Sequence, residues 1–304
     1  MSNIHTFTGN NLNRGDSIRY DEKKLDKLLE SKKAKFLPFF ELNPLIENLE
    51  TPKLGWLNKT EFSKIKVHLS IIEPFFLGFD ENQSPNFAFS LNNKVDFQKL
   101  QRNLIHMESR EIATKISHHE TGILAQAKSN IEWNKKNKFC SSCSNELKTF
   151  RGGIMRKCIN CNIEHFPRTD PVVIMLVYKD ENCVLGQTRL RQKNGFYSCL
   201  AGFMDQGESI EEAVRREVKE ESGLDVGKIL YHSSQPWPFP SSLMIGCHAE
   251  AISDRIIIDT NEMTDVKWFS KKEVTLALQN KSKIINVPGP IAIAHHLIKA
   301  WAFN

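Results

Sequence analysis

Residues 202–224 read Gly-Phe-Met-Asp-Gln-Gly-Glu-Ser-Ile-Glu-Glu-Ala-Val-Arg-Arg-Glu-Val-Lys-Glu-Glu-Ser-Gly-Leu, and this stretch contains a helix with its own start and stop signals. Ser209, followed three residues later by Glu212, predicts a capping box, and Gly223 stands where a helix commonly ends. At about 100° per residue, one face of this helix collects apolar side chains, namely Ile210, Ala213, Val214 and Val218. The side expected to face solvent carries Arg215, Lys219 and Ser222.

Three carboxylates of this helix, Glu217, Glu220 and Glu221, fall on or beside its apolar face. Carboxylates placed there repel one another and are costly to desolvate unless a cation lies among them. A solvated acidic helix would instead place its charges opposite the valines. The simplest explanation is a hard, oxygen-binding cation, Mg²⁺ or Mn²⁺. Arg216 lies at the border of the face and is expected to pair with Glu208 across the preceding loop.

Two CxxC pairs lie upstream, Cys140–Cys143 and Cys158–Cys161, with fourteen residues between them. Each pair can place two thiolates on one side of a tight turn, and together they complete a tetrahedral sulfur shell. Four thiolates leave no open coordination position, so the spacing predicts one structural Zn²⁺ per subunit in preference to a redox pair or plain core cysteines. The intervening loop contains four basic residues, Lys148, Arg151, Arg156 and Lys157. They could contact phosphate, but a solvated loop is the simpler interpretation.

The stretch from Gly202 to Leu224 resembles the complete Nudix box, with every glutamate of the pattern present. Downstream, Ser234–Ser242 reads Ser-Gln-Pro-Trp-Pro-Phe-Pro-Ser-Ser. Its alternating prolines predict a stiff, extended wall that presents Trp237 and Phe239. This array, together with a four-cysteine ribbon before the box, is similar to the NADH pyrophosphatase subfamily of Nudix hydrolases.

The resemblance implies an α/β/α Nudix sandwich that cleaves NAD(H) with water to NMN(H) and AMP, and that removes NAD caps from RNA 5′ ends by the same chemistry. It implies that the catalytic metals are held by the Ala201 carbonyl, Glu217, Glu221 and Glu262. The catalytic set is Glu208, Arg216, Glu217, Glu220 and Glu221, with the general base left open between Glu220 and Glu221. The implied nucleotide contacts are Phe166, Ala201, Gly202, Phe203, Gln235, Pro236, Trp237, Pro238, Phe239, Pro240, Ser241, Ser242 and the Ala294 backbone. A homodimer is implied as well.

The layout predicts an N-terminal α+β domain over residues 1–134, a zinc ribbon over 135–167 and a catalytic domain over 168–304. In the first part, Leu25, Leu28 and Leu29 favour a short amphipathic helix. Strands are expected at 67–72, 75–79 and 87–91, and helix over much of 95–134. The last helix is expected at 290–302.

Composition sets the remaining bounds. The 304 residues carry a net charge of +5, with 40% hydrophobic and 25% charged residues, which excludes a disordered or fibrous chain. The longest apolar run is strand-sized, and the first residues do not resemble a secretory signal. We therefore expect a cytoplasmic protein, with peroxisomes and other organelles left open. Two alternatives remain: a Nudix hydrolase of ADP-ribose or diadenosine compounds, and a non-catalytic zinc-ribbon binding module, which would predict a degraded box.

Overall fold

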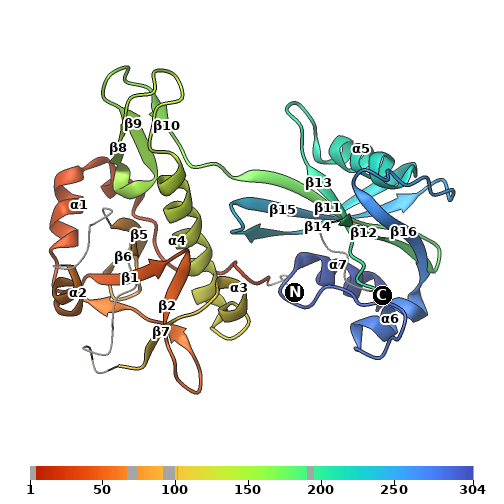
Figure 1. Cartoon of the computed structure of the whole chain (residues 1–304), viewed down its shortest axis with the longest axis horizontal. Helices are drawn as coiled ribbons and strands as arrows, with labels where there is room; N and C mark the ends of the chain where they lie inside the picture. The colour runs from red at the N-terminus through yellow and green to blue at the C-terminus, as the bar shows by residue number, and fades with distance from the viewer. Residues whose placement is uncertain (1–4, 67–73, 92–99, 101, 190–194, 304) are drawn as a thin grey trace. The chain divides into compact units, whose positions relative to one another are not determined.

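The computed structural model describes residues 5–66, 74–91, 100, 102–189 and 195–303 (Figure 1). The chain forms two compact units. The N-terminal unit contains Thr6–Arg168 together with Trp237–Ser241, and the C-terminal unit contains His5, Thr169–Pro236 and the chain from Ser242 onward.

The sheet of the N-terminal unit is built around β1 (Lys35–Phe40). This strand pairs parallel with β6 and antiparallel with β2 and β4, and the path through the sheet runs β3-β2-β1-β6-β5, with β7 on β2. The other strands are β2 (Asn43–Glu47), β3 (Lys53–Leu54), β4 (Leu57–Asn58), β5 (Phe75–Phe79), β6 (Pro85–Leu91) and β7 (Leu104–His106).

Phenylalanines fill the core of this unit. Phe36 and Phe62 stack with ring centroids 3.9 Å apart, and Phe87 stacks on Phe36 at 5.6 Å. Phe62 comes from a helix and the other two from neighbouring strands, so the rings join helix to sheet. The helical elements are η1 (Asp16–Tyr20), α1 (Glu22–Leu29), α2 (Lys59–Lys66), α3 (Ser109–Ile112) and α4 (His118–Lys136).

Several expectations for this unit are confirmed, and one is wrong. The leucine-rich helix is α1, and the expected strands at 75–79 and 87–91 are β5 and β6. The strand expected at 67–72 lies outside the described residues. The helix expected over 95–134 is wrong at Leu104–His106, which forms β7, and confirmed over α4; residues 95–99 and 101 lie outside the described residues. Leu45 pairs with His106 across sixty residues of chain, a contact that no local pattern could show.

A small three-stranded sheet carries the cysteine pairs. Its strands are β8 (Leu147–Phe150), β9 (Met155–Cys158) and β10 (Glu164–His165), with the short turn η3 (Arg151–Gly153) joining the first two. β9 lies in the middle and pairs antiparallel with both neighbours. These strands lie at the opposite end of the N-terminal unit from β7 (Figure 1).

The C-terminal unit is an α/β/α sandwich, as predicted. Its sheet runs β14-β15-β11-β12-β16, with β13 paired to β11. The strands are β11 (Asp170–Lys179), β12 (Asn182–Thr188), β13 (Leu200–Phe203), β14 (Val226–Trp237), β15 (Ser242–Ala251) and β16 (Met263–Ser270). The helices are α5 (Ile210–Ser222), α6 (Lys271–Leu278) and α7 (Ile293–Ala302).

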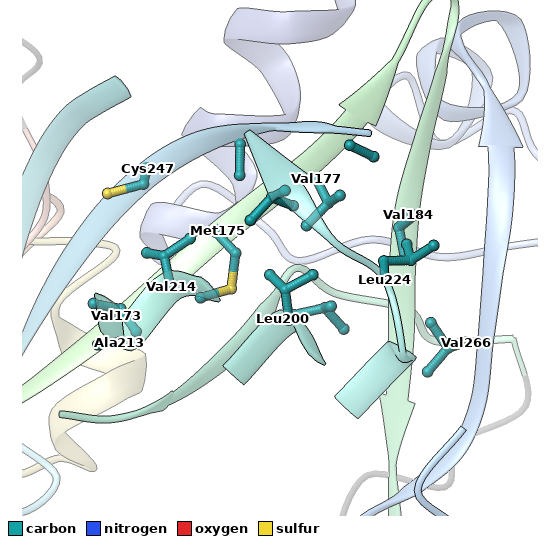
Figure 2. Packing of buried hydrophobic residues seen from close by; sticks show 14 of the residues in the cluster. Val173, Met175, Val177, Val184, Leu200, Ala213, Val214, Leu224, Cys247 and Val266 are labelled. Carbon is teal, nitrogen blue, oxygen red and sulfur yellow. The ribbon is translucent and has the colours of Figure 1, made fainter. Parts of the chain in front are cut away.

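Strand β11 shows how the layers form. Val173, Met175 and Val177 point to the side of α5 and pack with Ala213 and Val214, as Figure 2 shows. The intervening Ile174 and Leu176 point to the other side and pack with α6 and α7. Successive side chains of a strand face opposite sides, so a continuous apolar run is what a strand covered on both faces requires.

Two details of the helices differ from expectation. The last helix begins at Ile293 and not at Pro290. Ser222, expected on the solvent side of α5, is fully buried. Its carbonyl accepts a hydrogen bond from the Ile257 amide, so a distant loop covers the end of the helix. The part of the chain that the structure describes contains no helix long and apolar enough to span a membrane.

Candidate active site

Helix α5 is fixed at both ends by its own sequence. Ser209 Oγ accepts a hydrogen bond from the Glu212 amide, and the Glu212 carboxylate accepts one from the Ser209 amide. Gly223 adopts the left-handed conformation, with φ of 73°, and its amide donates to the Lys219 carbonyl. The predicted capping box and C-terminal glycine are confirmed, so the helix has a defined start and end.

Two of the three carboxylates are turned into the protein. Glu217 is 8% exposed and Glu221 is 4% exposed, whereas the side chain of Glu220 is 55% exposed. Val214 and Val218, on the same face of the helix, are fully buried. Burial explains why the pKa values of Glu217 and Glu221 are both raised, the latter to about 8 with a further contribution from the Glu217 charge.

Strand β13 lies against these two carboxylates. The Ala201 amide donates a 3.2 Å hydrogen bond to Glu221 Oε2. A Cβ built on Gly202 would lie 2.0 Å from Cδ of Glu217, so the Glu217 carboxylate occupies the space that any side chain at position 202 would need. The glycine at this position therefore matters for the close approach of Glu217 and not for its backbone angles: a larger residue would displace the carboxylate.

Arg216 ties the loop, the helix and the strand together. Its Nε and Nη2 donate to the two oxygens of Glu208 at 2.6 and 2.8 Å, which confirms the expected pair and shows that it is bidentate. Its Nη1 donates to Glu217 at 2.8 Å and to Glu220 at 2.9 Å. Nη2 also donates to the Phe203 carbonyl at 2.8 Å. The hydrogen bonds from Arg216 lower the pKa of Glu208 to about 2.

The chemistry of this donor set fits a divalent cation. Glu217 and Glu221 are desolvated carboxylates that repel each other, and the exposed Glu262 adds a third negative charge that raises both pKa values further. Hard oxygen ligands of this kind suit Mg²⁺ and Mn²⁺.

The cysteines form a tighter cluster than the carboxylates. Among the described residues, one group of three or more His, Cys, Asp or Glu side chains has all its ligand atoms within 4.8 Å of one another, and it is Cys140, Cys143, Cys158 and Cys161. The Sγ atom of Cys143 lies 3.4 Å from that of Cys158 and 3.5 Å from that of Cys161. A tetrahedron with zinc–sulfur bonds of about 2.3 Å has edges of about 3.8 Å, so the cluster is compatible with zinc.

The predicted nucleotide contacts divide between the two units. Phe203, the second residue of the box, is 61% exposed, and Ala201 and Gly202 precede it on β13. Phe166, 52% exposed, belongs to the N-terminal unit, as do Trp237, Pro238, Phe239, Pro240 and Ser241. Phenylalanine side chains are usually buried in a core, whereas those of Phe203 and Phe166 are exposed.

The proline array is not extended along its whole length. The strand β14 ends at Trp237, and the Phe239 amide then donates to the Trp237 carbonyl in a tight turn. Gln235 is fully buried, with Nε2 donating to the Ile291 carbonyl and Oε1 accepting from the Ile293 amide. The Gln235 side chain therefore fixes the entry to α7. Ala294 lies in the first turn of that helix and is buried.

Sequence reasoning missed two cations of the N-terminal unit that hold the array. Lys128, buried within α4, donates to the Pro238 carbonyl at 2.7 Å, and its Nζ lies 4.7 Å from the ring of Phe239. The guanidinium of Arg110 lies 4.3 Å from the same ring. The sequence contained one signal for Lys128, because this lysine directly follows the largely apolar stretch 122–127 of the helix.

Family models match both halves of the chain. A Nudix domain covers residues 168–287, and an NADH pyrophosphatase-like rudimentary Nudix domain covers residues 33–133. An NAD-capped RNA hydrolase of Schizosaccharomyces pombe is 33% identical over 98% of this chain and 93% of its own length. The chain belongs to the Nudix family.

Other relatives within the Nudix family carry related names. The human mitochondrial NAD(P)H pyrophosphatase NUDT13 is 35% identical over 76% of this chain and 72% of its own length. The NAD-capped RNA hydrolase NUDT12 of Macaca fascicularis is 46% identical over 62% of this chain. The chain spans 43% of the length of that relative.

Proposed function

We propose that this chain hydrolyses the pyrophosphate bond of NAD(H), NADH + H₂O → NMNH + AMP, and removes NAD caps from RNA by breaking the same bond. The observation that carries the proposal is the complete box assembled around Arg216, with Glu217 and Glu221 buried beside β13. The names of relatives matched along most of the chain support the substrate class.

The residues proposed to hold the catalytic cations are Glu217, Glu221, Glu262 and the Ala201 carbonyl. A bound Mg²⁺ or Mn²⁺ supplies positive charge for the phosphate oxygens and lowers the pKa of water. Two buried, mutually repelling carboxylates are an unfavourable arrangement without such a charge, which supports this assignment.

The side chains of this chain have three further roles in the proposal. Arg216 holds Glu208, Glu217 and Glu220 in register, so the carboxylates meet the substrate in one arrangement. Either Glu220 or Glu221 takes the proton of the attacking water. Phe203, exposed at the start of the box, stacks on a base of the nucleotide.

The remaining assignments concern the whole protein. We propose a structural Zn²⁺ in the four-cysteine cluster, a homodimer, and nucleotide contacts by the array residues Gln235–Ser242, Phe166 and Ala294. Gln235 would act by holding Ile291 and Ile293, since its side chain is committed to their backbone. The division into 1–134, 135–167 and 168–304 is supported by the two family matches. The cytoplasmic location stays a prediction, because one relative is named mitochondrial and another chloroplastic.

The test is chromatography of the products formed with Mn²⁺ from NADH and, separately, from an NAD-capped RNA. We expect NMNH and AMP from the first and a 5′-monophosphate RNA from the second. Glu221→Gln should lower turnover by more than about a hundredfold. Loss of a residue that only hydrogen-bonds a metal ligand costs about 10- to 100-fold, and Glu221 is proposed to bind the cation directly. Glu211→Gln, an exposed change in the first turn of α5, is the matched control.

Two results would contradict the proposal. Hydrolysis of ADP-ribose or diadenosine compounds without NADH turnover would favour the other Nudix substrates. Full activity in Glu221→Gln, with a fold unchanged by circular dichroism, would show that the catalytic cation lies elsewhere.

A further inference from the structure

The positive charge of this protein is concentrated in one short segment. Residues 135–168 contain eight Lys and Arg residues against two Asp and Glu residues. The rest of the chain contains 33 basic and 34 acidic residues, so this segment carries more than the whole net charge of +5. A clustered charge of this kind is typical of a surface that meets a polyanion.

Strand pairing places part of this charge on one face of the three-stranded sheet. Lys148 lies directly opposite Lys157 on β9, whereas their neighbours Leu147 and Cys158 pair on the buried face. Like charges directly opposite each other are destabilising. Glu164 of β10 stands opposite Lys157 on its other side, but among the described residues neither lysine forms an ion pair within 4.0 Å, so a bound anion would relieve the repulsion between the lysines.

The same face carries an exposed aromatic side chain. Phe139 is 65% exposed and forms an isolated antiparallel bridge with Glu146, the residue that directly precedes β8, the strand of Lys148. Glu146 and Glu164 share this face and offset the two lysines, so its excess positive charge comes from the exposed flanking residues Lys135, Lys138 and Arg168; Lys136 is paired with Glu132 at 2.6 Å.

A second aromatic and basic group lies on the turn η3. The guanidinium of Arg151 lies 4.3 Å from the ring of Tyr20 and 6.0 Å from that of Phe166. Tyr20 is 63% exposed and Phe166 is 52% exposed. Arg156 is excluded from the surface set, because its guanidinium donates to the carbonyls of Asn134 and Leu147 and holds the sheet against α4.

We propose that the ribbon, residues 135–167, together with the adjoining Arg168, binds the single-stranded RNA that follows an NAD cap. Lysine side chains contact its phosphates, and unpaired bases stack on the exposed rings. Exposed rings beside cations favour RNA over an acidic protein, and bases are accessible for stacking in a single strand but not in a duplex. The inference rests on the proposed removal of NAD caps and names the surface that takes the RNA.

The test compares two charge-matched double variants by fluorescence anisotropy with a labelled, uncapped, single-stranded RNA oligomer. One is Lys148→Gln with Lys157→Gln; the control is Lys32→Gln with Lys33→Gln, two exposed lysines of the same unit. Each lost phosphate contact should reduce the salt slope by about 0.7. The ribbon variant should therefore bind RNA about 25-fold more weakly at 0.1 M salt, because two contacts are lost.

Phe139→Ala separates stacking from charge. It should weaken RNA binding by about fivefold or more while leaving the salt slope unchanged. Zinc content and circular dichroism establish that each variant is folded, and the single change Lys148→Gln provides a milder version with about a fivefold loss.

The outcomes are distinct from those for the proposed function. Turnover of free NADH should be equal in the ribbon variant and the control, because the ribbon lysines are not assigned to the nucleotide site. RNA binding by the ribbon variant that equals the control, or equal affinity for an RNA duplex and a single strand, would overturn the inference even if NADH is hydrolysed. If the ribbon variant loses RNA binding as expected but the unmodified protein does not hydrolyse NADH, only the proposed function is contradicted.

Discussion

A single methyl group added at Gly202 would occupy the position of the Glu217 carboxylate. The new Cβ would lie 2.0 Å from Cδ and 2.1 Å from both carboxylate oxygens, whereas ordinary contact begins at 3.4 Å. Gly202 is paired within β13 to Val173 of β11, so its backbone is held and the glutamate must move. Restoring contact requires a shift of at least about 1.4 Å. A misplacement of about 1 Å at a catalytic group can cost about a hundredfold in rate.

Gly202→Ala should therefore lower kcat/KM for NADH about a hundredfold while the protein remains folded. The matched control is Gly289→Ala, because a Cβ there meets nothing within 4 Å. The assay is product chromatography at several Mn²⁺ concentrations, with circular dichroism for the fold. We expect the loss to be partly recovered at high Mn²⁺, since a displaced ligand weakens cation binding.

A double-mutant cycle isolates the cause. In a Glu217→Ala background the carboxylate is gone, so adding Gly202→Ala should cost little more. If Gly202→Ala has full activity, or if it costs the same hundredfold in both backgrounds, the proposed contact between these residues does not explain the glycine of the box.

Three other predictions concern metal, pH and packing. Cys158→Ser removes one of the four thiolates proposed to bind zinc, so it should abolish zinc binding and lower the melting temperature of the N-terminal unit. Zinc content and calorimetry measure this, and an unchanged melting temperature would contradict it. The pKa of Glu221 near 8 means that this carboxyl is largely protonated at pH 7 in the metal-free protein, so Mn²⁺ affinity should rise with pH up to about 8 and binding should release protons. Titration calorimetry in buffers of different ionisation enthalpy tests this, and the same apparent enthalpy in all buffers would refute it. Leu176→Ala, at a fully buried site of β11, should cost about 2–5 kcal/mol of unfolding free energy in denaturant melts; a cost below about 1 kcal/mol would mean that the α6–α7 layer repacks freely.

The structure shows why some predictions from sequence were accurate. The ends of α5 depend on Ser209, Glu212 and Gly223, which act within one turn of chain, so local sequence contains all the information. The helical period then fixed the face of Glu217 and Glu221, and burial of both confirms that face. The four cysteines likewise come together because each CxxC turn is local and each pair joins one hairpin end.

Other features depend on segments far apart in the sequence. Ser222 is buried because the loop at Ile257 covers the end of α5, although its helical angle indicated solvent. The strand β7 forms because β2 offers it a partner, and three residues contain too little pattern to predict that. Lys128 holds the Pro238 carbonyl across 110 residues of sequence.

The sequence by itself determined the chemistry of the box, the capped helix that presents it and the sulfur cluster of the ribbon, because spacing along one element sets which side chains share a face or a turn. Tertiary structure alone decided that Glu217 fills the space beside Gly202, that Gln235 fixes the start of α7, and that Lys148 faces Lys157. Each of these depends on a distance between separate elements, and such distances arise only when the elements pack.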